Sequence, residues 1–207
     1  PVVNTKKVVN SAEDTTSSTV TPNVSAADET IPFPKNGIKL SYLLNEFVKE
    51  CGGKEALEGL TTTDVCNEFV KPATKDCALS YCDMILEKVK ITAELNGVVD
   101  TATVFISHAW KYKFIDVLSA LEDHFKDEPE KIVWFDLVSN NQIKGPDLDY
   151  EWWATTFKDA IEQLGHTVMV MAPWNNPIPY QRAWCIFEAY CTSVTDAKFE
   201  IAMSNIE

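Results

Sequence analysis

Thr167-Val168-Met169-Val170-Met171 is an unbroken apolar run in the second half of the chain. A short run with no polar alternation is typical of a strand that is buried on both faces. Strands of that kind occur at the centre of parallel sheets, where helices cover both sides. This stretch therefore predicts the central strand of a parallel α/β sheet.

Strand and helix patterns alternate on both sides of this run. Short connections between alternating elements predict a parallel sheet with right-handed crossovers and a flavodoxin-like α/β fold. Four strands are an incomplete sheet, so we expect the domain to be truncated, with a final helix and strand after residue 207. The further strands are expected at 103–107, 132–135 and 199–203, and helices at 114–125, at 153–164 and around Glu188, the last with Pro179 in its first turn.

The first half of the chain lacks this alternation of strand and helix patterns. Residues 1–35 are rich in Ser, Thr and Pro and predict a disordered tail. Residues 36–95 predict an accessory helical segment, and residues 100–207 the α/β domain. Three helices are expected in this segment, over 38–48, about 61–70 and about 76–90. The run Thr61-Thr62-Thr63 offers an N-cap for the second of them, and Pro72 is expected to end it. Residues 137–150 are expected to form a loop.

Composition excludes several classes of protein. The net charge of −13 argues against nucleic-acid or anionic-membrane binding, which needs clustered Lys and Arg. No apolar run approaches the roughly 18–20 residues that span a bilayer. The six cysteines form no C-x-x-C pair and no zinc spacing, so we expect reduced, buried thiols, no metal site and a cytoplasmic protein.

Glu188 is the only charged residue between Ala183 and Thr195. In a helix its face is shared with the residues three and four positions away, which are Trp184, Cys185, Cys191 and Thr192. A carboxylate on such an apolar stripe must be hydrogen-bonded, paired or shifted in pKa. Glu188 is therefore the best candidate for a functional acid, with a structural carboxylate as the alternative.

A ligand pocket is expected beyond the carboxyl ends of the first and third parallel strands. The first strand leads into Ser107, His108, Trp110 and Lys111, and the third leads toward Trp174. With Arg182 at the entry of the Glu188 helix, these aromatic, polar and cationic groups suit a planar ligand that carries phosphate. Glycine-rich phosphate loops, a receiver-type acidic cluster and a G-x-S-x-G elbow are absent from the sequence.

Other residues near this expected pocket have simpler interpretations. His108 is either a pocket residue or a capping histidine. Trp184 and Cys185 are interpreted as core residues, because packing explains their place on the helix. Asp136, which follows the second parallel strand, is interpreted as a turn residue.

Three blocks together resemble a Toll/interleukin-1 receptor (TIR) domain, with plant-type members the most similar. They are Val104-Phe105-Ile106-Ser107-His108, the stretch 157–162 that leads into 168–171, and Ala183-Trp184-Cys185-Ile186-Phe187-Glu188. The order and spacing of the blocks match over residues 103–203. The whole chain also resembles the N-terminal region of kinesin-light-chain-like tetratricopeptide-repeat proteins, whose repeats would lie beyond residue 207.

The resemblance implies a signalling module that self-associates and cleaves NAD+ at the nicotinamide–ribose bond, as an NAD+ nucleosidase or ADP-ribosyl cyclase. By this resemblance Glu188 is the essential acid, the loop after the first strand lines the pocket through Ser107, His108 and Trp110, and residues 137–150 control access or assembly. NAD+ is then the substrate, and no cofactor is implied. The alternatives are a TIR-like scaffold with an inert pocket, and an adaptor that binds partners through the C-terminal repeats.

Overall fold

The computed structural model describes residues 33–144, 150–173 and 175–203, and of residues 150–153 the backbone alone. Residues 1–32 of the expected disordered tail lie outside the described residues. The described residues all belong to one compact unit. The expected accessory segment and the expected α/β domain are therefore both described within that unit.

The unit is built on one mixed sheet with the strand order β2-β1-β4-β3-β5-β6. β3 pairs in parallel with β4 and β5, and β5 pairs in parallel with β6, whereas β1 is antiparallel to both of its neighbours. The parallel strands thus follow the flavodoxin-like order, which confirms the predicted α/β class. The strands are β1 Asn36–Lys39, β2 Val99–Thr101, β3 Val104–Ser107, β4 Ile132–Phe135, β5 His166–Val170 and β6 Lys198–Ala202.

The apolar run that predicted the centre of the sheet forms β5. This strand lies between β3 and β6, and Val168 and Met169 are both fully buried. Successive side chains of a strand point to opposite faces, so an unbroken apolar run fits a strand with helices on both sides. The prediction of a central parallel strand is confirmed.

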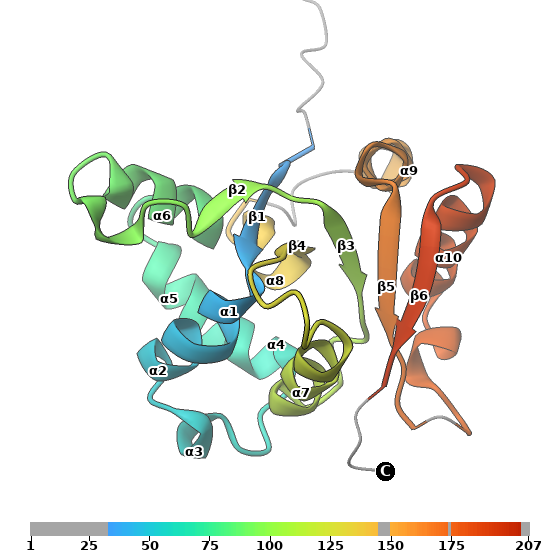
Figure 1. The fold of residues 1–207 in the computed structure, drawn as a ribbon, viewed down its shortest axis with the longest axis horizontal. Helices are drawn as coiled ribbons and strands as arrows, with labels where there is room; N and C mark the ends of the chain where they lie inside the picture. Colours follow the sequence, from blue (N-terminus) through green and yellow to red (C-terminus); the bar gives the residue numbers. More distant parts are fainter. Residues whose placement is uncertain (1–32, 145–149, 174, 204–207) are drawn as a thin grey trace, which may run out of the picture. The chain divides into compact units, whose positions relative to one another are not determined.

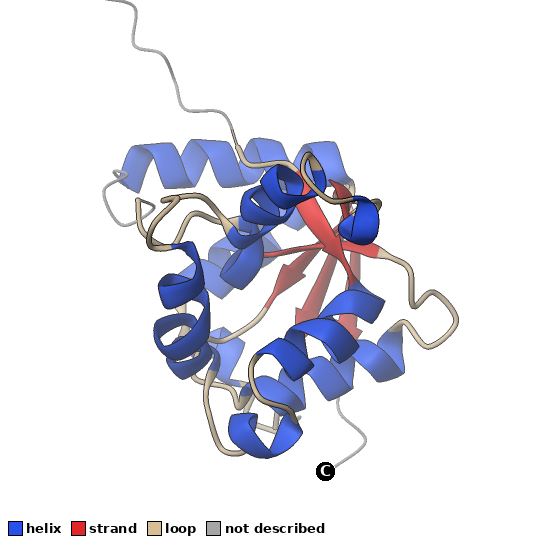
Figure 2. Ribbon diagram, turned by 90° about the vertical axis from the view of Figure 1, so that its left-hand side faces the viewer, coloured by secondary structure: helices blue, strands red, loops and turns tan. Residues whose placement is uncertain are grey.

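Two layers of helices cover the sheet (Figures 1 and 2). One face packs against α7 (Phe114–His124) and the N-terminal helices around a core that includes Ile106 and Val168. The other face packs against α9 (Tyr150–Leu164) and α10 (Ala183–Val194), where Phe105 and Trp134 stack with ring centroids 4.8 Å apart. Both long helices expected after 114 and 153 are present.

The start of the accessory segment is a strand, contrary to the helix expected from residue 38. Ile38 pairs with Val99 on one side and Val133 on the other, so β1 extends the sheet beyond β4. A Cβ added at Gly37 would lie 2.6 Å from the carbonyl oxygen of Val133, so the strand passes very close to its neighbour. Helix formation begins at the next residues, through α1 Leu40–Tyr42, a π-helical turn Leu43–Phe47, α2 Val48–Glu50 and α3 Lys54–Leu57.

The next two expected helices have different bounds. The predicted N-cap among residues 61–63 is confirmed, and the structure shows that it is Thr61, which forms a capping box with Asp64. The helix does not end at Pro72, because a π-helical turn precedes that proline and the helix continues to Thr74. Its parts are α4 Thr62–Val65, the π turn Cys66–Val70 and α5 Lys71–Thr74, and the third helix, α6 Tyr81–Val89, begins later than expected because Ser80 caps it.

Three smaller features also differ from the expectations. The loop expected at 137–150 overlaps a short helix, α8 Asp136–Ser139. Pro179 lies in a separate 3-10 helix, Ile178–Gln181, and not in the first turn of α10. All six cysteines lie in the described residues and are free, but Cys77 is exposed, contrary to the expectation that the thiols are buried. A further 3-10 turn, Ala93–Leu95, precedes β2.

Within the part of the chain that the structure describes, no helix combines the length and the apolar character that crossing a membrane requires.

Candidate functional site

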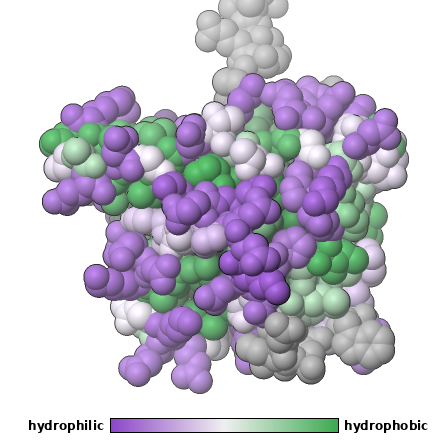
Figure 3. Space-filling view, in the orientation of Figure 1, coloured by the Kyte–Doolittle hydropathy of each residue, from purple (hydrophilic) through white to green (hydrophobic). Residues whose placement is uncertain are grey.

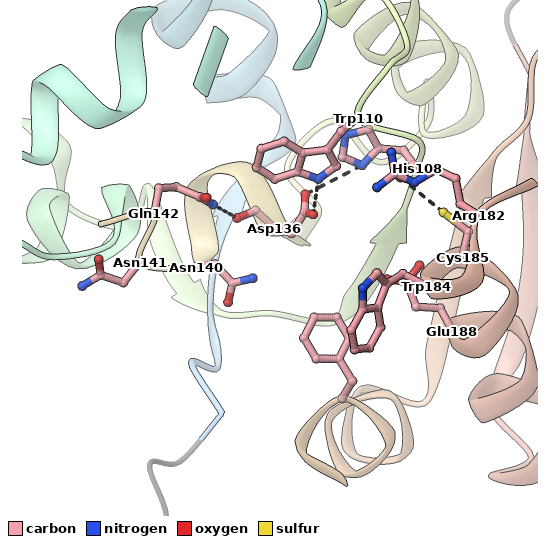
Figure 4. Close-up of a pocket in the computed structure, with 11 residues that line it drawn as sticks. His108, Trp110, Asp136, Asn140, Asn141, Gln142, Arg182, Trp184, Cys185 and Glu188 are labelled. Carbon is pink, nitrogen blue, oxygen red and sulfur yellow. Dashed lines mark hydrogen bonds and ion pairs between the residues drawn. The ribbon is translucent and has the colours of Figure 1, made fainter. Parts of the chain in front are cut away.

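A pocket of about 300 Å³ opens at the carboxyl ends of β3 and β4, beside the first turns of α10 (Figure 4). This edge of a parallel sheet is where ligands bind in open α/β folds. The volume is at the lower end of the range for small-molecule sites, roughly 300–1,000 Å³. Its walls are His108, Trp110, Asp136, Asn140, Asn141, Gln142, Phe157, Arg182, Trp184, Cys185 and Glu188.

Glu188 lies in this pocket because α10 starts at the carboxyl edge of the sheet and buries one face. Cys185, Cys191 and Thr192 are buried on that face, and the Thr192 hydroxyl bonds to Thr167 on β5 at 2.9 Å. The Ser107 hydroxyl, at the end of β3, donates a hydrogen bond to Glu188 Oε2 at 2.5 Å. The carboxyl group of Glu188 therefore lines the pocket and is tied to the adjacent strand.

Burial raises the pKa of Glu188 from its ordinary value of 4.5 to about 8. The Ser107 hydrogen bond and the charge of Arg182 both lower this pKa, and the neighbouring carboxyl group of Asp136 raises it. Arg182 precedes α10, lines the same pocket and gives it one cationic group. Glu188 is thus an acid whose proton is released near neutral to slightly basic pH.

Asp136 is a second carboxyl group in the pocket, and its interpretation as a turn residue was wrong. It begins α8 at the carboxyl end of β4, and its Oδ2 accepts a hydrogen bond of 2.5 Å from the Trp110 indole. Burial raises its pKa to about 7, while the bond from Trp110 lowers it. Its position after a strand adjacent to β3 was the available sequence signal, since the carboxyl ends of adjacent parallel strands share one edge.

His108 is a buried wall residue held from two sides. Its Nε2 lies 3.2 Å from the Thr62 hydroxyl, and its backbone carbonyl accepts a bond from the Cys185 thiol at 3.5 Å. Its Nδ1 lies 3.8 Å from Asp136 Oδ1, and within the described residues neither atom has a hydrogen-bond partner. Burial lowers the pKa of His108 to about 3, so the ring is neutral at physiological pH.

Trp184 lies on the pocket wall, one helical turn before Glu188. It is 36% exposed, so the prediction of a core residue was wrong, whereas Cys185 is buried as expected. The sequence signal for its place on the wall was its spacing from Glu188. Residues i and i+4 lie on the same helix face, so Trp184 faces the pocket together with Glu188. Phe157 of α9 lies beside it, with ring centroids 6.2 Å apart.

The remaining predicted pocket residues have mixed outcomes. Ser107 is buried behind the wall, is not itself a wall residue, and bonds to the wall residue Glu188. Lys111 is exposed and is not among the wall residues. Trp174 lies outside the described residues. The expected pocket between the first and third parallel strands is therefore displaced toward β4, because Asp136 and residues 140–142 form one wall.

Among the described wall residues, the pocket presents two carboxyl groups of raised pKa, one guanidinium, two indoles and three side-chain amides. No group of three or more His, Cys, Asp or Glu side chains in the described ranges is arranged to hold a metal ion. The groups present suit a ligand with an aromatic ring, hydroxyl groups and an anionic portion.

Comparisons of the chain with protein-family models, with curated proteins and with solved structures return no match.

Proposed function

We propose that this pocket cleaves NAD+ at the bond between nicotinamide and ribose. The observation that carries the proposal is the partly buried carboxyl group of Glu188, which lines a pocket with Trp184 and Arg182 and bonds to Ser107 at 2.5 Å. The resemblance of the three sequence blocks to TIR domains supports the same reaction, with Glu188 as the catalytic carboxylate. On this proposal the protein is a cytoplasmic, TIR-like signalling enzyme.

The proposed reaction needs only one carboxylate. The pyridinium nitrogen of NAD+ is positively charged, so it takes the bonding electron pair and leaves as neutral nicotinamide without a general acid. The ribose carbon becomes oxocarbenium-like, as in glycoside hydrolysis. A carboxylate held beside it stabilises that charge, and water then attacks the carbon and releases a proton, which gives ADP-ribose. Attack by the adenine base of the same molecule would give the cyclic product.

The protonation behaviour of Glu188 fits a substrate that brings a cationic ring into the pocket. A buried carboxyl group with a pKa of about 8 is mostly neutral at pH 7 in the empty pocket. A pyridinium ring beside it favours the ionised form, so substrate binding promotes release of the proton. Burial also strengthens the interaction between the carboxylate and the developing positive charge, because the local dielectric is low.

The other walls have roles in binding. Trp184 and Trp110 present indole rings to the pocket, which suits stacking on nicotinamide or adenine. Arg182 offers a guanidinium fork to the pyrophosphate. A cavity of about 300 Å³ holds one half of a dinucleotide, so the adenosine half would extend toward solvent.

The experiment measures nicotinamide release from NAD+ by purified protein, both dilute and clustered on a surface. Glu188→Gln preserves the size of the side chain and removes its ionisation. Glu162→Gln, an exposed glutamate on α9 outside the pocket walls, is the matched control. We expect Glu188→Gln to lose at least 100-fold in rate and the control to match wild type. Equal rates in all three proteins, or no release by the clustered wild-type protein, would refute the proposal.

A second candidate is a scaffold that self-associates without catalysis. Its support is a set of exposed apolar residues on α10 and β6. Figure 3 shows a green area on the side of the molecule where Figure 1 places β6. Monomeric proteins rarely expose contiguous apolar surface of this kind. We propose that a second copy of this chain covers it, as in a homo-oligomer. The exposed residues are Ile186, Tyr190 and Val194 on α10 and Phe199, Ile201 and Met203 on and after β6.

Light scattering after size exclusion tests this candidate. Tyr190→Glu places a charge in the centre of the α10 row, and Ile91→Glu places one at an apolar residue that is 85% exposed elsewhere. We expect wild type and the Ile91 variant to oligomerise with increasing concentration and the Tyr190 variant to remain monomeric. A wild-type protein that is monomeric at all concentrations would contradict it.

A further inference from the structure

The N-terminal helical segment pairs edge to edge with the loop that forms one wall of the pocket. Residues 60–63 run antiparallel to residues 110–114, with a bridge between Thr61 and Lys113. The backbone N–H of Thr62 donates to the carbonyl of Tyr112 at 3.1 Å, and that of Phe114 donates to the carbonyl of Leu60 at 2.8 Å. Backbone hydrogen bonds therefore hold together, at the edge of the pocket, two segments that are about fifty residues apart in the sequence.

Trp110 is held at both ends by this arrangement. Its carbonyl accepts hydrogen bonds from the backbone N–H of Thr63 at 3.2 Å and from the Thr63 hydroxyl at 3.3 Å. Its indole donates to Asp136 on the far side of the ring. The backbone of Trp110 is thus set by α4, and the direction of its ring by α8.

Thr62 reaches deeper into the wall. Its side chain is fully buried, and its hydroxyl bonds to His108 Nε2 at 3.2 Å. The rings of His108 and Trp110 are nearly parallel, with centroids 6.5 Å apart, so a rotation of His108 would disturb the indole. An apolar group in place of the hydroxyl would leave the buried imidazole nitrogen unpaired, which is unfavourable and promotes such a rotation.

The first turn of α4 is itself fixed by hydrogen bonds and by packing. The capping box satisfies the backbone N–H groups of Thr61 and Asp64. Val65, in the same turn, is fully buried in the main core. The π-helical turn that follows packs against α8, which carries Asp136. Both attachments of Trp110 therefore lead back to one helical segment.

We infer that Thr62 and Thr63 are positioning residues for the pocket, and that the N-terminal segment is an integral part of the site. Thr62 holds the ring of His108 and Thr63 holds the backbone of Trp110, whose indole bonds to Asp136 in the same pocket. The geometric part of this inference is independent of the reaction. Its consequence for nicotinamide release rests on the proposed function.

The test compares three substitutions by NMR without any ligand. Thr62→Val removes the hydroxyl at constant size, and Thr62→Ser retains it. Thr74→Val is the matched control, because Thr74 is also fully buried, lies in the same helical segment and donates to the carbonyl of Val70 outside the pocket walls. The readout is the Trp110 indole N–H resonance, assigned by its loss in Trp110→Phe.

We expect Thr62→Val to shift this resonance and to speed its hydrogen exchange about tenfold or more. Thr62→Ser should restore the wild-type shift. Thr74→Val should lower the melting temperature by a similar amount and leave the indole resonance unchanged. An indole resonance that responds equally to Thr62→Val and Thr74→Val would overturn the inference, because the effect would then be one of general stability.

Activity separates the two proposals. If wild type releases nicotinamide, Thr62→Val should lower kcat/KM about tenfold, Thr62→Ser should recover it and Thr74→Val should leave it unchanged. An altered indole resonance in Thr62→Val, together with no nicotinamide release by clustered wild type, would leave the positioning role intact and refute the proposed function. Unchanged activity and an unchanged indole resonance in Thr62→Val would refute the positioning role alone.

Discussion

Ser107 donates a hydrogen bond of 2.5 Å to Glu188, a residue 81 positions later in the chain. The bond joins the end of β3 to the second turn of α10 and fixes the acid at the carboxyl edge of the sheet. It also opposes the effect of burial, because a donor to the ionised form lowers the pKa of the carboxyl group. Several measurable properties depend on this one contact.

Removing the donor should change the pH dependence of activity. In Ser107→Ala the pKa of Glu188 rises further above 8, because the group that favours its ionised form is lost. We expect nicotinamide release to fall about tenfold at pH 7, and less at pH 9, where the carboxyl group is ionised in both proteins. Rates measured from pH 6 to 9.5 would show this. An equal fall at every pH would mean that Ser107 acts in another way.

Removing the neighbouring acid should have the opposite effect. Asp136 raises the pKa of Glu188, so Asp136→Asn lowers it while preserving the side-chain size. Because the carboxylate is the active form, the rising limb of the rate profile should move to lower pH. In a plot of kcat/KM against pH, we expect the midpoint of the rising limb to move down by about 0.5 to 1 pH unit. A limb that stays in place would exclude electrostatic coupling between the two acids.

Stability should depend on pH through the same group. The pKa of Glu188 is raised in the folded protein, so between about pH 4.5 and 8 the folded state holds a proton that the unfolded chain has released. Stability from this group is therefore fully present below pH 4.5 and is lost as pH rises toward 8. Glu188→Gln, which cannot ionise, should be more stable than wild type at pH 8 by on the order of 2 kcal/mol, with the difference shrinking toward pH 5.

Urea unfolding of Glu188→Gln and wild type at pH 5 and pH 8 measures this difference. Glu162→Gln again serves as the control and should follow wild type at both values. A Glu188→Gln variant that is less stable than wild type at pH 8 would show that the carboxylate has a compensating partner in the folded state.

The entry of β1 into the sheet should be sensitive to a single methyl group. In Gly37→Ala the new Cβ would lie 2.6 Å from the Val133 carbonyl oxygen and 2.7 Å from the Cβ of Ala102. Both neighbours are buried, Val133 in β4 and Ala102 in the connection between β2 and β3, so we expect a loss of about 2–3 kcal/mol. Asn36→Ala, which removes one hydrogen bond to Asp83, should cost about 1 kcal/mol or less. Thermal unfolding of both variants compares them, and equal stabilities would contradict the close packing of β1.

Periodicity and residue type determined much of the fold from the sequence alone. The apolar run at 167–171 predicted the central strand, because a strand that is buried on both faces is apolar at every position. The apolar stripe from Phe114 to Phe125 predicted α7, because a helix that is buried on one face is apolar at every third or fourth position. The same argument placed Glu188 on an apolar helix face. A carboxyl group that shares its face with Cys185 and Thr192 cannot be solvated on every side.

Tertiary structure alone decided which distant segments share the pocket. β1 is too short for a periodic signal, and it becomes a strand because backbone groups of β4 and β2 pair with it. The roles of Asp136 and Thr62 depend on contacts with Trp110 and His108 that no local pattern encodes. Local propensities specify single elements, whereas a site at the edge of a sheet is assembled from the ends of several elements brought together only by packing.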